Sequence, residues 1–132
     1  MKDTNSNIVC VIDDDKIYRF TIERYLKVHQ LSEQIIEFSD AEDALNFLES
    51  NVDNPNLLPD IIFLDVNMPI IDGWKFMLKY QEFCSKLCKN IRIYMFSSSI
   101  DSRDQERAKD FPEISDFIVK PISEQKLKEL FI

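Results

Sequence analysis

Five short apolar runs, separated by longer amphipathic segments, are the feature of this 132-residue sequence that most constrains its fold. The apolar residues in these runs are nearly continuous, which is typical of strands buried on both faces in a parallel sheet. Parallel strands need long crossover connections, and the amphipathic segments between the runs are long enough to be helices. The sequence therefore predicts a doubly wound α/β domain with right-handed crossovers. The predicted strands are Ile8–Ile12, Gln34–Phe38, Asp60–Leu64, Ile91–Phe96 and Ser115–Val119.

The amphipathic segments predict five helices. The first carries an apolar stripe from Tyr18 to Leu26, and the second begins near Ser39-Asp40, a good N-cap pair. The third is predicted from Gly73 to Cys88, because its apolar residues keep helical spacing through that range. The fourth is short and mostly charged, and the fifth offers apolar residues to a core; their predicted ranges are Asp101–Lys109 and Ser123–Phe131.

Length and charge limit the classes of function. The length fits a single domain, residues 1–132. A net charge of -8 argues against unaided binding to nucleic acid or to an anionic membrane. There is no apolar stretch of membrane-spanning length and no signal peptide, so we expect a cytoplasmic protein. Three cysteines in such a chain favour reduced thiols over a disulfide framework.

Polar groups follow four of the predicted strands. They are Asp13 and Asp14, Asp65, Ser97 and Lys120. The carboxyl ends of parallel strands meet at one edge of the sheet, where doubly wound domains form their sites. Carboxylates gathered there without a counter-charge would be costly, which implies a shared cation. Oxygen ligands, few in number, suit a hard ion such as Mg²⁺ that keeps several waters.

These strand ends carry a resemblance to a known family. The chain resembles the CheY-like receiver domains of two-component response regulators over essentially its whole length. The resemblance rests on Val11–Asp15, Phe63–Pro69 with Asp72-Gly73, Met95–Ser98 and Val119–Pro121. It implies a flavodoxin-like, five-stranded parallel sheet in the order 2-1-3-4-5 with five helices. It also implies that the chain accepts a phosphoryl group.

The resemblance assigns roles to the acidic residues. Asp65 matches the phosphoacceptor, since a carboxylate can act as a nucleophile and form an aspartyl phosphate. Asp14 matches the direct Mg²⁺ ligand, and Asp13 the acid that reaches the ion through water. The backbone carbonyl of Asn67 would complete the metal shell. The side chains of Asn67 and Ser99 would lie beside the phosphoryl group, where they could tune its lifetime.

Further residues match the family's phosphoryl-binding and structural positions. Ser97 would donate a hydrogen bond to a phosphoryl oxygen, and Lys120 would contact the phosphoryl group as a point charge. Phe117 matches an aromatic residue that changes rotamer on activation, here without the tyrosine hydroxyl often found there. Pro121 matches a proline whose preceding peptide bond is cis. Gly73, the only glycine in the chain, suggests a positive φ, a close backbone approach or a plain turn.

The expected partners are proteins. By the resemblance, a histidine kinase or a histidine phosphotransfer protein donates the phosphoryl group, and an unknown downstream protein reads it, without nucleic acid or membrane. The output surface would be the fourth helix, fifth strand and fifth helix, and weak homodimerisation is compatible with this. The chain ends just after the fifth helix, so we expect no output domain to follow.

Other interpretations stay open on the sequence. Asp13–Asp15 could simply cap the first helix, and we expect Asp15 to do so. A receiver-like adaptor that works without phosphorylation is the main alternative function. A Mg²⁺-dependent phosphatase of the haloacid-dehalogenase type also uses a strand-end aspartate, but it has a second acid where this chain has Asn67. We expect a phosphoacceptor with self-phosphorylation and autodephosphorylation chemistry, and not a turnover enzyme.

Overall fold

The computed structural model describes residues 7–32, 34–98 and 101–131. Within these residues, the five predicted strands form one parallel sheet in the order β2-β1-β3-β4-β5. The doubly wound α/β fold and its strand order are therefore confirmed. The strands are β1 (Ile8–Ile12), β2 (Gln34–Phe38), β3 (Ile61–Asp65), β4 (Arg92–Ser97) and β5 (Ile114–Val119).

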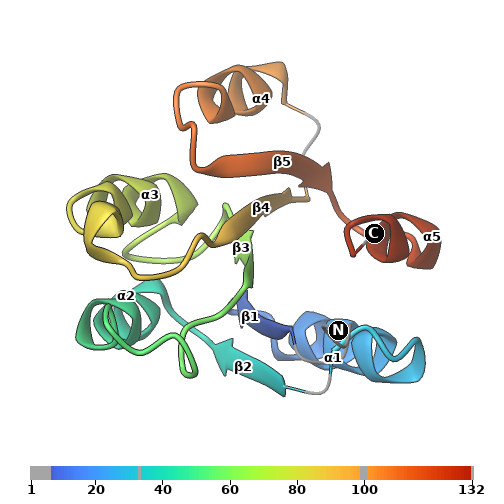
Figure 1. Ribbon diagram of the computed structural model, residues 1–132. Helices are drawn as coiled ribbons and strands as arrows, with labels where there is room; N and C mark the ends of the chain where they lie inside the picture. Colours follow the sequence, from blue (N-terminus) through green and yellow to red (C-terminus); the bar gives the residue numbers. More distant parts are fainter. Residues whose placement is uncertain (1–6, 33, 99–100, 132) are drawn as a thin grey trace.

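Five helices cover the two faces of this sheet (Figure 1). α1 and α5 lie on one face, α2 and α3 lie together on the other, and α4 lies beside β5. The helices are α1 (Lys16–Val28), α2 (Ala41–Ser50), α3 (Gly73–Gln81), α4 (Ser102–Ala108) and α5 (Glu124–Glu129). In the part of the chain that is described, no helix combines the length and the hydropathy needed to cross a bilayer.

A polar side chain caps the start of each of these helices. Asp15 accepts hydrogen bonds from the N–H groups of Ile17 and Tyr18, which confirms its expected role at α1. The remaining caps are Asp40 for α2, Asp72 for α3, Asp101 for α4 and Ser123 for α5. Such caps satisfy N–H groups that the helix itself leaves unpaired, and each typically contributes about 1 kcal/mol.

Burial on both faces holds for the central strands only. All residues of β1 and β3 are buried, since they sit between two apolar layers. The prediction was wrong for β2 and β5, which form the two edges of the sheet. β2 exposes Gln34 and Glu37, and β5 exposes Ser115 and Asp116. An edge strand has a neighbour on one side only, so water reaches more of its side chains.

The third helix is shorter than predicted. α3 ends at Gln81, and a 3-10 turn, Cys84–Lys86, follows in place of the last helical turn. The N–H of Cys88 then donates to the carbonyl oxygen of Val52 at 2.9 Å, which turns the chain toward β4. Phe83 stays buried in this irregular segment. The apolar residues of this segment are therefore explained by packing against the core and do not indicate a continuing helix.

Gly73 holds the start of α3 against the end of β3. Its N–H donates to the carbonyl oxygen of Val66 at 2.9 Å, and its φ is not positive. A Cβ atom at this position would lie 2.8 Å from the carbonyl oxygen of Asp65 and 2.9 Å from the Cα of Val66. Of the alternatives for Gly73, close backbone approach is the correct one, and positive φ is wrong.

The loop between β3 and α3 has an unusual turn at its tip. Ile70 has a φ of 67°, and the N–H of Ile71 donates to the carbonyl oxygen of Pro69 at 2.8 Å across it. This three-residue turn places a β-branched residue in the left-handed region, at a cost on the order of 1–2 kcal/mol. The side chain of Ile70 is also 90% exposed, so burial does not offset that cost.

Candidate functional site

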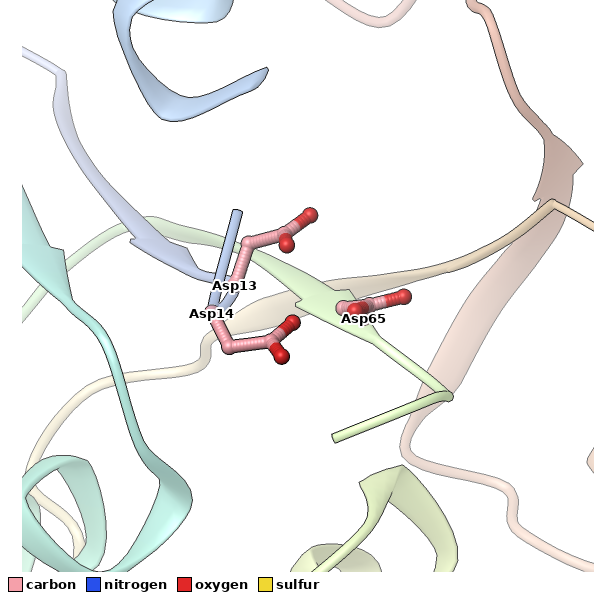
Figure 2. Close-up of side chains that lie close together, drawn as sticks. All are labelled: Asp13, Asp14 and Asp65. Atoms are coloured by element: carbon pink, nitrogen blue, oxygen red, sulfur yellow. The ribbon is translucent and has the colours of Figure 1, made fainter. Parts of the chain in front are cut away.

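Three carboxylates gather at the carboxyl ends of β1 and β3. Asp13 and Asp14 follow β1 directly, and Asp65 is the last residue of the neighbouring β3. Figure 2 shows their side chains projecting into one space, and an oxygen of each lies within 4.8 Å of the others. Asp13 and Asp65 are buried, whereas Asp14 is exposed. The donor set, oxygen only and negatively charged, fits a hard divalent cation such as Mg²⁺.

Lys120, directly after β5, brings a positive charge to this cluster. Its Nζ lies 2.7 Å from Oδ2 of Asp13 and 3.3 Å from Oδ1 of Asp65. Its backbone N–H donates to the carbonyl oxygen of Ser97 at 2.7 Å, which fixes the lysine beside the end of β4. The peptide bond between Lys120 and Pro121 is cis. Four strands thus deliver polar groups to one place, as the sequence predicted.

The electrostatics of the cluster follow from its burial. Burial and, after it, the charge of Asp13 raise the pKa of Asp65 to about 6, against the opposing effects of Lys120 and the N–H of Asn67. For Lys120, burial alone would lower the pKa, but the hydrogen bond and charge of Asp13, with the charge of Asp65, raise it overall. The lysine therefore stays cationic, and the cluster keeps a net negative charge that favours a metal ion.

Two residues of α1 support the site without having been predicted to do so. The ammonium of Lys120 sits 4.3 Å from the ring centroid of Tyr18, a cation–π contact. Arg19 donates to the carbonyl oxygen of Asp13 and pairs with Glu37 at 3.3 Å, which ties the end of β1 to β2. In sequence, Tyr18 reads as one residue of an apolar helical stripe. Nothing in that pattern signals its contact with a lysine about one hundred residues later.

The other predicted residues take different positions around the cluster. The N–H of Asn67 donates to Oδ1 of Asp65 at 3.3 Å, and its side chain is exposed. Ser97 is fully buried at the end of β4. Phe117 is half-buried and packs against the core beneath α2, α3 and α4. Ser99 lies outside the described residues.

Asp65→Asn is expected to be more stable than the wild type at pH 7 in metal-free buffer, by about 1–2 kcal/mol after allowance for solvent screening. The folded pKa of Asp65, about 6, lies above its ordinary value of 3.8. Protonated Asp65 therefore stabilises the fold at low pH, and this contribution is lost as pH rises from about 4 through about 6. Urea unfolding of the wild type and Asp65→Asn, in EDTA at pH values from about 4 to 7, measures the difference in their free energies of unfolding. If the difference in free energy of unfolding between the two proteins stays constant across this pH range, the expectation is contradicted.

The comparison with protein families gives one match that spans nearly the whole chain. Residues 9–132 match the model of the response regulator receiver domain. Receiver domains bind Mg²⁺ at an acidic pocket, and this structure has a cluster of three aspartates. Members of this family are signalling phosphoacceptors and not typically turnover enzymes.

Individual proteins agree with this match. The chain is 29% identical over 123 residues to the sensor histidine kinase CheAY of Helicobacter pylori, and 32% identical over 126 residues to its chemotaxis protein CheV3. These matches cover 91% and 92% of the chain but only 14% and 39% of those longer proteins. A two-component response regulator from Cytophaga hutchinsonii superposes with a TM-score of 0.84 at 27% identity, covering 94% of this chain and 92% of that one.

Proposed function

Because this chain belongs to the family of response regulator receiver domains, we propose that it accepts a phosphoryl group on Asp65 and signals through contact with another protein. One observation carries the proposal. Three carboxylates from the ends of β1 and β3 meet within 4.8 Å, and the ammonium of Lys120, directly after β5, contacts two of them. A nucleophilic carboxylate, a place for a divalent cation and a cationic side chain are the parts that phosphoryl transfer requires.

Asp65 is the proposed nucleophile. One of its carboxylate oxygens forms a bond to phosphorus while the bond between phosphorus and the donor's imidazole nitrogen breaks. The donor in this proposal is a histidine kinase or a histidine phosphotransfer protein. Its imidazole leaves with the electron pair of the broken bond and takes up a proton from solvent.

The residues around Asp65 hold the reacting group. The proposed direct ligands of Mg²⁺ are Asp14, Asp65 and the backbone carbonyl of Asn67. Asp13 would reach the ion through water. When bound, this ion neutralises charge on the phosphoryl oxygens. Lys120 exchanges its present contact with Asp65 for a phosphoryl oxygen, and Ser97 donates a hydrogen bond to another.

Structural change would follow from this exchange of partners. Ser97 is the last residue of β4 and Lys120 directly follows β5, so new bonds from both to a phosphoryl group would draw these two strand ends toward Asp65. Phe117, within β5, is the proposed residue that changes rotamer in response. Gly73 and Pro121 shape the two loops on either side of the site.

The proposed setting is the cytoplasm, and the proposed partners are the phosphodonor and a downstream protein, without nucleic acid or membrane. Weak homodimerisation is compatible with these roles. An adaptor that works without phosphorylation remains the second candidate, since its docking surfaces would need none of the site chemistry. The phosphatase interpretation has less support, because Asn67 replaces the second acid that such enzymes use.

Intact mass after incubation with acetyl phosphate tests the proposal. We expect one added phosphoryl group on the wild type when Mg²⁺ is present, none when EDTA removes it, and none on Asp65→Asn in either condition. The matched control is Asp60→Asn. Asp60 lies just before the first residue of β3, at the opposite end of the strand from Asp65, so this variant should still be phosphorylated.

Each contrary result has a defined meaning. A wild type that gains no phosphoryl group and binds no beryllofluoride would contradict the proposal and favour the adaptor. Steady hydrolysis of unrelated phosphoesters would instead favour the enzyme. Phosphorylation of Asp65→Asn at the wild-type rate would show that another residue is the phosphoacceptor.

A further inference from the structure

The helices α2 and α3 lie side by side on the face of the sheet away from α1 and α5 (Figure 1). A groove lies between these two helices. It consists of two adjoining hollows, of about 360 Å³ and 200 Å³, whose linings share Glu42 and Ile71. The smaller hollow reaches the β3–α3 loop, close to the end of the sheet that carries Asp65. The groove is separate from the carboxylate cluster, since none of Asp13, Asp14 and Asp65 lines it.

The smaller hollow is mainly apolar, and the larger one combines apolar and polar side chains. Leu45 of α2 and Phe83, just after α3, line the larger hollow, and Ala41, Pro69 and Ile70 line the smaller one. Ile70 stands at its edge with a 90% exposed side chain on a left-handed backbone. Glycine would hold this turn without strain and without exposing an apolar group. An apolar side chain held out under strain is suited to contact with something outside the chain.

The rim of the groove is acidic. It carries Asp40, Glu42, Asp43, Glu49 and Glu82, with Lys79 as the cationic residue among those that line it. Within residues 7–32, 34–98 and 101–131, none of these five carboxylates lies within 4.0 Å of a cationic side chain. Their negative charge is therefore available to an incoming cationic group.

We propose that the α2–α3 groove docks a segment of a partner protein that alternates apolar side chains with lysine or arginine. An apolar side chain enters the smaller hollow against Pro69 and Ile70, and the flanking cations pair with the rim carboxylates. Complementary charge selects this occupant over a second copy of the chain, whose own net charge is -8. Docking at this groove goes beyond the proposed function, because it needs neither Mg²⁺ nor a phosphoryl group on Asp65.

Fluorescence anisotropy with a labelled synthetic peptide tests the proposal. The probe is about twelve residues of alternating lysine and leucine, and the same peptide with serine in place of leucine measures the contribution of charge alone. Salt near 0.15 M screens attraction that is not local to the groove. We expect the lysine–leucine peptide to bind at least about tenfold more tightly than the lysine–serine peptide, and Asp65→Asn to bind it as the wild type does.

Two groups of variants locate the contact. Ile70→Gly, which relieves the left-handed strain and so keeps the fold, should weaken peptide binding about tenfold, whereas Leu78→Ala on the outer side of α3 should not. The double charge reversal Glu42→Lys with Glu49→Lys should also weaken peptide binding. Its control is the double reversal Asp110→Lys with Glu129→Lys, which changes the net charge by the same amount outside the groove and should weaken binding less.

Any of three results in the peptide and groove variants would overturn the proposal. They are equal binding of the leucine and serine peptides, equal losses from the groove reversals and the control reversals, and an unchanged affinity in Ile70→Gly. Loss of binding in Asp65→Asn would likewise overturn it, by assigning the peptide to the carboxylate site. Failure of acetyl phosphate to modify the wild type would leave these binding results unaffected, so the two proposals fail separately.

Discussion

Lys120→Met is expected to lower the free energy of unfolding by about 3 kcal/mol at neutral pH in metal-free buffer. The Nζ of Lys120 lies within 3.3 Å of both Asp13 and Asp65, and those two carboxylates are buried. Methionine keeps most of the side-chain volume against Tyr18, so the loss reports charge more than packing. Removing the cation leaves two neighbouring buried carboxylates to repel each other.

The pH dependence and a second substitution identify the cause of this loss. The destabilisation should shrink as pH falls toward about 6, because the loss of Lys120 raises the pKa of Asp65 further and the variant takes up this proton before the wild type does. Asp65→Asn added to Lys120→Met should recover much of the lost stability, so the two effects should not be additive. The control is Lys126→Met, which removes a half-exposed pair with Asp116 and should cost less than about 1 kcal/mol. Equal losses in the two lysine variants would contradict the expectation.

Gly73→Ala is expected to destabilise the protein by about 2–4 kcal/mol, through a clash that no side chain can relieve. The new Cβ would lie 2.8 Å from the carbonyl oxygen of Asp65 and 2.9 Å from the Cα of Val66, and both neighbours are backbone atoms. The higher helix propensity of alanine offsets about 1 kcal/mol at most. To relieve the clash, α3 must move away from the end of β3 that carries Asp65.

Urea unfolding measures this loss, with Lys75→Ala as the control. Lys75 is exposed two residues further along α3, so its replacement should change the stability by less than about 0.5 kcal/mol. The Gly73→Ala variant should also be phosphorylated by acetyl phosphate more slowly than the wild type, because the backbone of Asp65 is displaced. A stability equal to that of the wild type would show that the β3–α3 loop accommodates the methyl group by shifting.

The convergence at the carboxyl edge of the sheet could be predicted because parallel topology dictates it. If the apolar runs form parallel strands, then Asp13, Asp65, Ser97 and Lys120 must lie at one edge, whatever the details of packing. The spacing of the motifs then added the family resemblance. The direct contact of Lys120 with the two carboxylates was not predicted, since it depends on a side-chain conformation and not on register.

Helix ends and strained turns were less predictable, for physical reasons. The spacing of Phe83, Cys84 and Leu87 suits a helix, but it suits a 3-10 turn against the same core equally well, so periodicity alone could not end α3 at Gln81. Nothing in the sequence indicates a left-handed backbone at Ile70. Its left-handed φ is imposed by the loop that joins β3 to α3, against the residue's own preference for extended backbone.

The pairing of Asp13 with Lys120 joins residues 107 positions apart. During synthesis, the aspartates therefore leave the ribosome long before the lysine that neutralises them. A growing chain that has paired β1 with β3 still holds an uncompensated acidic cluster, and the arrival of β5 completes both the sheet and the charge balance. The charge balance of the site therefore depends on the last strand of the sheet to be synthesised.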